Sequence, residues 1–440
     1  MKQFFSMISI VVLVLFFFIS CDNETKNTND EEVSDQETGD EEANDDEASA
    51  IEMKYKKADE HAQAVSKEIV SANSALAMDL FSKLSFEESG VNMMISPLSI
   101  SIAMAMVTNG ASDENLAEMK EVLGFNDMTM EAVNKQFYEL IQSLVEADKD
   151  LVLSIANSVW MDDLFEPRVK EAFLDALLES YEAEPFTIDF QADGAKDTIN
   201  SWVSENTNGK IEKIIEQIQA DTVMYLINAI YFKAAWTVPF EKEQTSKGMF
   251  TKSDGNKIET YFMNSDGNYV NSFNYSEDDD FAVARLPYGR GKFAFYGILP
   301  RGEKTVEDIV DDMKENGIGK YFENLTERET PLTMPKFKVQ WGKSLVEVFQ
   351  TLGMEKAFVT GGFLNLADQG EKLYISDIKH KTFIEVNEEG TEAAAATVVE
   401  FGDAMGSFVL AFNKPFIYII RDDRSGTILF IGKVEDPSAE

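Results

Sequence analysis

The chain has 440 residues, of which 44% are hydrophobic, so it supports a large core and is not a disordered chain. Its formal net charge is −40, from 79 acidic against 39 basic residues, so nucleic acid and anionic surfaces repel it. We therefore expect no nucleic-acid partner, and ascribe the charge to a heavily solvated surface or, alternatively, to a saline habitat. The single cysteine, Cys21, excludes an intrachain disulfide, and two histidines leave few routes to catalysis.

The amino terminus has the composition of a secretory signal, with an almost wholly apolar run from Phe4 to Ser20. A small residue directly before the lone Cys21 resembles a bacterial lipobox, although Phe18 replaces the more common leucine. In such signals cleavage precedes the cysteine, which then carries several acyl chains that anchor it stably. We expect residues 1–20 to be a lipoprotein signal peptide and Cys21 to be the lipidation site. The alternative is an uncleaved anchor helix, and both place the protein on a membrane outside the cytoplasm.

Residues 21–64 are acidic, with runs such as Asp30-Glu31-Glu32, and carry few large apolar side chains. Such a segment cannot bury enough apolar surface to offset its chain entropy. It predicts a disordered, self-repelling tether, with cation binding as the alternative. Residues 65–440 contain no proline-rich or glycine-rich linker, so we expect one domain there.

The folded part is rich in helices first and in strands later. Leucines at every fourth position from Leu76 to Leu84 indicate one face of a helix, and Phe173, Leu177 and Tyr181 mark another. Ser96-Pro97 supplies a capping serine and a proline for a helix start, and Asn109-Gly110 supplies a stop. Later apolar runs predict strands at 224–232 and 292–299, and a hairpin formed by 416–420 and 427–434. This order favours an α+β fold.

No catalytic motif is complete. A serine hydrolase needs a positioned base, yet the core holds only His380 and no Gly-x-Ser-x-Gly elbow is present. Gly342-Lys343-Ser344 resembles the end of a phosphate loop, but Phe337 stands where its first glycine belongs. Gly289-x-Gly291-x-x-Ala294 leads into a strand, whereas a dinucleotide loop opens a helix. One cysteine and two distant histidines make no zinc site. We therefore expect no enzyme, no cofactor and no metal.

The segment 388–397, Glu-Glu-Gly-Thr-Glu-Ala-Ala-Ala-Ala-Thr, opens a long stretch without apolar periodicity. Its alanines are compatible with a helix, but strand-like runs flank it at 382–386 and 408–412. Gly390 offers a flexible start. A loop of about two dozen residues inside a compact domain is usually functional. These residues alone predict an exposed loop of unknown purpose.

Several segments resemble signatures of the serpin family of protease inhibitors, in the family's order, over roughly residues 70–437. One such match carries little weight, but together they are specific. The matching segments are Asn92-Met-Met-Ile-Ser-Pro-Leu-Ser-Ile100 for the shutter, Ile199 to Ile211 for helix F, Asn228 to Trp236 with Pro239-Phe240 for the breach, His380 to Gly390 leading into the hinge, and Asn413-Lys-Pro-Phe416 with Gly426 to Gly432 for the carboxyl-terminal signature.

The resemblance implies an α+β serpin fold with three β-sheets, eight or nine helices and an exposed reactive-centre loop. In inhibitory serpins a target protease cleaves this loop and forms an acyl-enzyme. The freed loop then inserts as a new strand in the large sheet, with release of stored strain. A dozen inserted residues span roughly 40 Å at about 3.3 Å each, far enough to drag the protease across the inhibitor. The protease is distorted before it can deacylate.

The resemblance assigns the role of hinge to the segment from Glu388 to Thr397. Alternate side chains of a strand face one side, so four small uncharged residues, beginning with Thr391, would face inward while Glu392 meets solvent. A charge at Thr391 would be buried without a partner. The composition therefore favours an inhibitor over a structural or hormone-binding serpin. The hinge residues are Glu388, Glu389, Gly390, Thr391, Glu392, Ala393, Ala394, Ala395, Ala396 and Thr397, of which Thr391, Ala393, Ala395 and Thr397 would face inward.

Two counts place the scissile bond between Ala404 and Met405. In the family it usually follows the seventeenth residue counted from the hinge glutamate Glu388, and the spacing back from Asn413-Lys-Pro-Phe416 gives the same bond. An alanine suits the shallow pocket of elastase-like or subtilisin-like serine proteases. A one-residue error would nominate Asp403 or Met405, and Met405 suits chymotrypsin-like or elastase-like enzymes. Inhibition of cysteine proteases is a further alternative.

The resemblance also assigns structural roles. Trp236 belongs to the breach, where the loop enters, and Lys336 either pairs there with Glu388 or is an ordinary solvated lysine. The region that matches helix D, residues 127–147, has few basic residues, so we expect no activation by heparin. The expected partners are a target serine protease and, through Cys21, a membrane, with the protein a monomer on a cell surface or in the periplasmic or extracellular space. The shutter residues, whose hydrogen bonds control opening of the large sheet, are Ser96, Ser99, Asn228 and His380.

Overall fold

The structure is a computed structural model that describes residues 39–439 apart from 146, 150, 266–272, 329–330, 360 and 392–408; the side chains of 39–48 and 328 are not described. Residues Met1–Ser49 and Ala50–Glu440 form two separate units, and all of the described strands belong to the second. None of the helices in the described ranges has the length and apolar character needed to cross a membrane.

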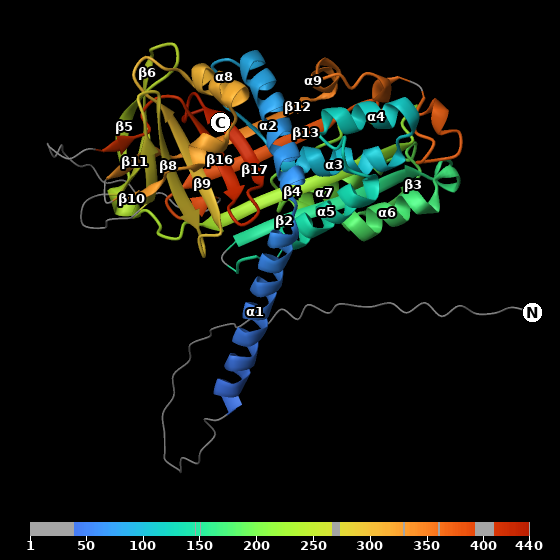
Figure 1. Ribbon diagram of the computed structural model, residues 1–440, viewed down its shortest axis with the longest axis horizontal. Coiled ribbons are helices and arrows are strands. Elements are labelled where there is room, and N and C mark those ends of the chain that lie inside the picture. Colours follow the sequence, from blue (N-terminus) through green and yellow to red (C-terminus); the bar gives the residue numbers. More distant parts are fainter. Residues whose placement is uncertain are drawn as a thin grey trace, which may run out of the picture. The chain divides into compact units, whose positions relative to one another are not determined.

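Three β-sheets form the body, and Figure 1 shows β2 and β4 as its longest strands. The six-stranded sheet, called the large sheet here, pairs its strands antiparallel except for β2 with β3. Its strands in spatial order are β12 (Phe337–Ser344), β13 (Lys379–Asn387), β14 (Gly390–Thr391), β4 (Met224–Ala235), β2 (Leu151–Asp162) and β3 (Glu184–Ile188).

Of the other two sheets, the seven-stranded one contains the longest strands that are buried throughout. Every residue of β9 and β17 is buried, which matches their continuous apolar runs. The seven-stranded sheet contains, in spatial order, β1 (Met93–Ile95), β17 (Ile428–Val434), β16 (Phe416–Asp422), β9 (Phe293–Pro300), β8 (Phe281–Tyr288), β7 (Phe273–Glu277) and β10 (Thr326–Arg328). The four-stranded sheet contains β15 (Leu410–Ala411), β11 (Leu332–Pro335), β6 (Lys257–Ser265) and β5 (Ser246–Thr251).

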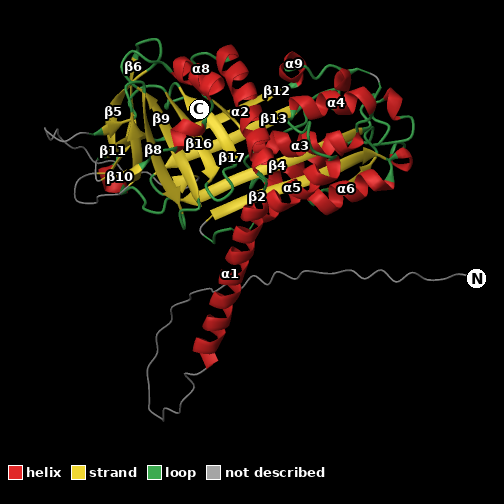
Figure 2. Cartoon of the chain, in the orientation of Figure 1, coloured by secondary structure: helices red, strands yellow, loops and turns green. Residues whose placement is uncertain are grey.

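Nine α-helices occur in the described residues, and most of them lie around the end of the body that holds β2 and β4 (Figure 2). The helix start predicted at Ser96-Pro97 is confirmed, because the Ser96 side chain accepts a hydrogen bond from the Ser99 N–H at 3.2 Å. The helices are α1 (Gly39–Ala64), α2 (Lys67–Glu87), α3 (Pro97–Gly110), α4 (Asp113–Val122), α5 (Met130–Leu144), α6 (Glu171–Tyr181), α7 (Ala195–Asn206), α8 (Val306–Asn316) and α9 (Val346–Thr351).

The expectation that residues 21–64 form a disordered tether is wrong for its second half. Helix α1 occupies Gly39–Ala64, and its side chains Tyr55, Ala58 and Ala62 are buried. The physical reason is a narrow apolar stripe at helical spacing, in which small alanines bury little area each but allow close packing. The Tyr55 hydroxyl accepts a hydrogen bond from the Lys149 N–H at 3.0 Å, which fixes this part of the helix on the body.

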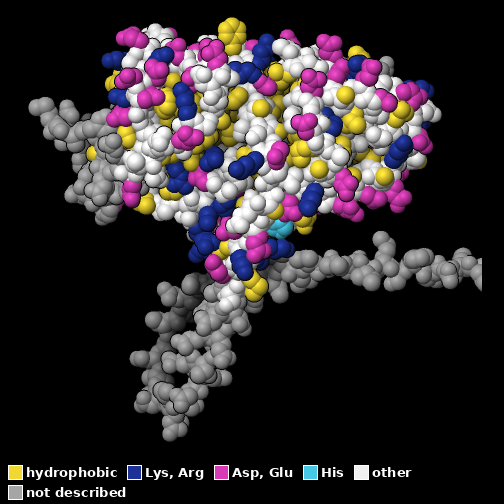
Figure 3. Space-filling model, in the orientation of Figure 1, with side chains coloured by type: hydrophobic (Ala, Val, Ile, Leu, Met, Phe, Trp, Pro, Cys, Tyr) yellow, Lys and Arg dark blue, Asp and Glu magenta, His cyan; other side chains and the backbone are white. Residues whose placement is uncertain are grey.

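Acidic and basic side chains are interspersed on the surface. Figure 3 shows acidic side chains spread over the visible face, with lysines and arginines between them. This distribution agrees with the interpretation of the net charge as a heavily solvated surface.

Candidate functional site

The hinge begins as a tight turn that leads from β13 back into the large sheet. Residues Gly390 and Thr391 form β14, which pairs with Asn387 and Val386 on one side and with Ala235 and Ala234 on the other. Gly390 has φ of 151°, and a Cβ atom at this position would lie 2.0 Å from the Ala234 carbonyl oxygen. Only glycine fits there, because the turn presses its backbone against β4.

Glu388 anchors this turn at the breach. Its carboxylate lies 2.9 Å from the Lys336 ammonium and accepts a hydrogen bond from the Thr245 hydroxyl at 2.7 Å. Burial raises the pKa of Glu388, but the hydrogen bonds from Thr245 and Lys336 outweigh it, so its pKa lies below the ordinary value. The predicted pairing of Lys336 with Glu388 is therefore confirmed. Glu389 is half exposed and pairs with Lys242.

Trp236 holds the main chain of the turn in place. Its indole N–H donates to the Asn387 carbonyl at 2.9 Å, and its backbone N–H donates to the Glu389 carbonyl at 3.0 Å. The indole stacks on Tyr288, with ring centroids 4.5 Å apart. The hydroxyls of Tyr288 and Thr391 are 2.7 Å apart. Sequence reasoning missed Tyr288 and Thr245, because both lie more than a hundred residues from the hinge and no local pattern marks them.

Beyond β14, the large sheet contains a gap. β4 and β13 pair outward with β2 and β12 along their length, but toward each other no described strand pairs with them except the two residues of β14. The gap is part of a cavity of about 460 Å³. Both strands line it, together with α3 and the segment 211–215 that follows α7. An opening between two strands whose facing edges pair with no other described strand is the geometry that accepts an added strand.

The shutter lies where α3 meets this gap. The Ser96 N–H donates to His380 Nε2 at 3.0 Å, and the Ser96 hydroxyl donates to the Leu429 carbonyl at 2.8 Å. These bonds join α3 to β13 and to the seven-stranded sheet. Burial lowers the pKa of His380 to about 3, so the ring is neutral and its Nε2 is free to accept. Ser99 contributes its backbone N–H, which donates to the Ser96 hydroxyl oxygen.

Asn228 faces the same gap from β4. Its amide group donates to Asn157 Oδ1 at 2.8 Å, while its own Oδ1 is buried without a hydrogen-bond partner among the described residues. In the described structure no hydrogen bond joins Asn228 to His380, although both line the cavity. Of the four residues assigned to the shutter, Ser99, Asn228 and His380 line the cavity. Hydrogen bonds link Ser96 with His380 and with Ser99.

Other predicted residues fall outside the described part of the chain. These are Cys21, the hinge residues Glu392, Ala393, Ala394, Ala395, Ala396 and Thr397, and the bond between Ala404 and Met405. The described chain re-enters with Val409 beside β15, which pairs parallel with β11.

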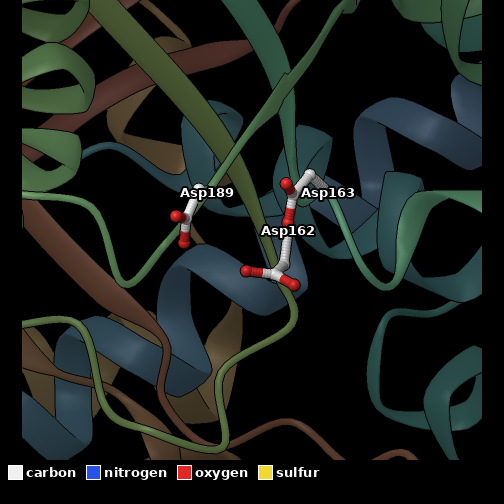
Figure 4. A group of neighbouring side chains, drawn as sticks. All are labelled: Asp162, Asp163 and Asp189. Carbon is white, nitrogen blue, oxygen red and sulfur yellow. The ribbon is translucent and has the colours of Figure 1, made fainter.

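An acidic cluster lies where β2 and the edge strand β3 end (Figure 4). Asp162 accepts hydrogen bonds from the backbone N–H groups of Leu164 and Phe190, both at 3.1 Å. Asp189 accepts one from the Gln191 N–H at 2.8 Å. Because these carboxylates shape the turns that hold them, and Asp163 is exposed, the cluster is explained without a ligand.

Comparisons with known proteins agree with this architecture. The family model described as "Serpin (serine protease inhibitor)" matches residues 71–437. A serpin-like protein of Methanosarcina acetivorans is 32% identical over 406 residues, which cover 88% of this chain and 92% of that relative. The leukocyte elastase inhibitor of Homo sapiens is 33% identical over 387 residues, covering 84% of this chain and all of the relative (100%).

Solved structures give the same result. The thermophilic serpin tengpin in its native state is 32% identical, with a TM-score of 0.74 over 84% of this chain and 95% of that structure. Human thyroxine-binding globulin is 28% identical, with a TM-score of 0.74 over 84% of this chain and 99% of that structure. The expected fold of three sheets with eight or nine helices is confirmed. This chain belongs to the serpin family.

Proposed function

We propose that this serpin inhibits serine proteases with shallow, elastase-like or subtilisin-like specificity pockets, through cleavage after Ala404 and insertion of the loop into the large sheet. One observation carries the proposal: the first hinge residues, Gly390 and Thr391, are already paired between β13 and β4, and the gap continues beyond them. The positions that would face inward after insertion, 393, 395 and 397, carry alanine and threonine, which fit a buried strand face.

The test is incubation of the protein with pancreatic elastase, chymotrypsin, subtilisin and papain. We expect a covalent complex with elastase or subtilisin that resists denaturants, and a new amino terminus at Met405. Papain serves as the probe for inhibition of cysteine proteases. Cleavage of the loop with full protease activity retained would contradict the proposal.

A matched variant tests the insertion step. Thr391→Arg places a charge where the native side chain is 2% exposed, so the cleaved loop would have to bury it. We expect this variant to be cleaved as a substrate, with protease turnover instead of a stable complex. Thr391→Ser, which keeps a small hydroxyl residue, is the control and should inhibit like the parent. Inhibition by Thr391→Arg at the parent level would refute the role of the hinge.

A second candidate is a serpin that binds a partner at the surface without inhibiting proteases. Thyroxine-binding globulin, solved in complex with thyroxine, is 28% identical to this chain with a TM-score of 0.75. The same protease panel separates the two, because such a serpin would be cleaved without trapping any enzyme.

We also propose that Cys21 carries the lipid that holds the protein on a membrane outside the cytoplasm. The support is the apolar run that ends at Ser20-Cys21. Expression in a bacterial host with radiolabelled palmitate should label the parent and leave Cys21→Ser unlabelled. Equal labelling of both chains would exclude this anchor.

A further inference from the structure

The first inserted residue of the hinge makes a side-chain contact with a different sheet. The hydroxyl of Thr391 lies 2.7 Å from that of Tyr288, which ends β8 in the seven-stranded sheet. The exposed fractions are 2% for Thr391 and 0% for Tyr288. Within the described residues, neither hydroxyl has another hydrogen-bond partner. Each therefore depends on the other to satisfy its hydrogen-bonding capacity in a buried place.

The position of Tyr288 is set independently of the hinge. Its ring stacks on Trp236 with an angle of 9° between the ring planes, and it meets the Phe232 ring edge-on at 5.3 Å. Its backbone is held by pairing with Phe293 of β9 and by an isolated bridge to Trp236. Burial raises the pKa of Tyr288, so the phenol keeps its proton and is able to donate. The Tyr288 hydroxyl is thus a hydrogen-bonding group in a fixed position at the end of the gap.

We propose that Tyr288 is a positioning residue that recognises the hydroxyl of Thr391 and holds the start of the reactive-centre loop in register between β13 and β4. The inference rests on the proposed function, since it concerns how loop insertion begins. A strand that slips by one residue turns its inward side chains outward. The contact selects the register in which Thr391 faces Tyr288, opposite Val386 and Ala234. The small residues two, four and six positions later then face the same way.

Hydrogen exchange tests the contact without any protease. Removal of one hydroxyl leaves the other buried and unpaired, which predicts about tenfold faster exchange of the backbone amides in 386–391 for Tyr288→Phe and for Thr391→Val. Thr391→Ser keeps a hydroxyl and should exchange like the parent. Tyr418→Phe is the matched control, because Tyr418 is a fully buried tyrosine whose hydroxyl has no partner among the described residues. It should leave exchange in 386–391 unchanged.

The double variant Tyr288→Phe with Thr391→Val separates recognition from a general loss of packing. With both hydroxyls removed, no polar group is left unpaired, so exchange should return toward the parent rate. If the two single effects simply multiply, or if Tyr288→Phe exchanges like the parent, the positioning role is wrong. An effect of Tyr418→Phe as large as that of Tyr288→Phe would also overturn it.

The inhibition readout distinguishes this role from the proposed function. With pancreatic elastase, we expect Tyr288→Phe to need severalfold more inhibitor molecules per protease inactivated, because slower insertion lets more acyl-enzyme hydrolyse. If neither the parent nor any variant inhibits a protease, but Tyr288→Phe and Thr391→Val speed hydrogen exchange in 386–391 as expected, the proposed function fails and the positioning role stands. Should the parent inhibit and Tyr288→Phe match it in both exchange and inhibition, the positioning role fails alone.

Discussion

At the scale of single residues, His380 makes the free energy of unfolding of the protein depend on pH. Burial lowers its pKa to about 3, against about 6.5 in an unfolded chain. Between these values the unfolded chain binds a proton that the native protein does not. The free energy of unfolding is therefore fully retained above pH 6.5, and this residue alone reduces it by about 1.4 kcal/mol for each pH unit below that, toward pH 3.

The variant His380→Gln isolates this contribution. A glutamine keeps an acceptor for the Ser96 N–H, which now donates to the histidine at 3.0 Å, but does not titrate. Urea unfolding between pH 4.5 and 7.5 should give a smaller pH slope for the variant, while the carboxylates contribute equally to both proteins. Parallel slopes would show that His380 does not carry the effect.

Because Glu388 is buried and Glu389 is half exposed, removal of their lysine partners should change the stability of the protein by different amounts. The Glu388 side chain is 4% exposed, and Lys336 is 28% exposed. Lys336→Met removes the counter-charge and should lower the free energy of unfolding by about 2 kcal/mol, less than for a fully buried pair because Lys336 is partly solvated. Lys242→Met removes the partner of the half-exposed Glu389 and should change little. Equal effects in urea titrations would contradict this account.

Sequence motifs and structure agree at residues whose role depends on local pattern. Ser96 caps α3, as the pattern Ser96-Pro97 predicted. The motif match left Lys336 as either a partner of Glu388 or a solvated lysine, and the structure shows the pair. The contact of Thr391 with Tyr288 was not predictable, because it joins positions 103 apart through the crossing of two sheets. The partners of Asn228 and His380 within the described residues, Asn157 and Ser96 respectively, were not predictable either, because they depend on how the strands are spaced.

At the scale of elements, α1 shows where sequence patterning was insufficient. Strands β16 and β17 were predicted as a hairpin, since continuous apolar runs around a charged turn leave little choice. Helix α1 was missed because its acidic neighbourhood dominates the composition, while its buried face offers one tyrosine and two alanines. The gap in the large sheet was expected only through the family resemblance, because the free edges of β4 and β13 arise from their separation.

The docking of α1 predicts that Tyr55 matters for stability. Tyr55 is 7% exposed, and the Arg290 guanidinium lies 4.1 Å from its ring centroid. Tyr55→Ala should lower the free energy of unfolding by about 3 kcal/mol, through lost burial and the cavity left behind. Met53, on the same helix and 68% exposed, provides the control, and Met53→Ala should stay within about 0.5 kcal/mol of the parent. Urea titrations in which both variants match the parent would mean that α1 does not add to the stability of the body.

At the scale of the whole molecule, the facing edges of β4 and β13 pair with no strand among the described residues except β14, so this part of the large sheet has room for further strand pairing. The hinge already occupies one end of the gap, so a cut after Ala404 would free the loop to extend β14 along it. Ten further residues in a strand paired on both sides form about two main-chain hydrogen bonds each, roughly twenty in all, and at about 1 kcal/mol each these contribute on the order of 20 kcal/mol.

Cleavage should therefore stabilise this protein, although cleavage usually weakens a fold. We expect the free chain cut after Ala404, separated from the covalent elastase complex, to melt at least about 10 °C above the intact chain in differential scanning calorimetry. Thr391→Arg, cut at the same bond, is the control: a charge at this buried position should keep the hinge and the loop that follows it out of the sheet, so cutting should not raise the melting temperature of this variant. If the cut parent melts no higher than the intact parent, the loop does not insert, and the gap between β4 and β13 serves another purpose.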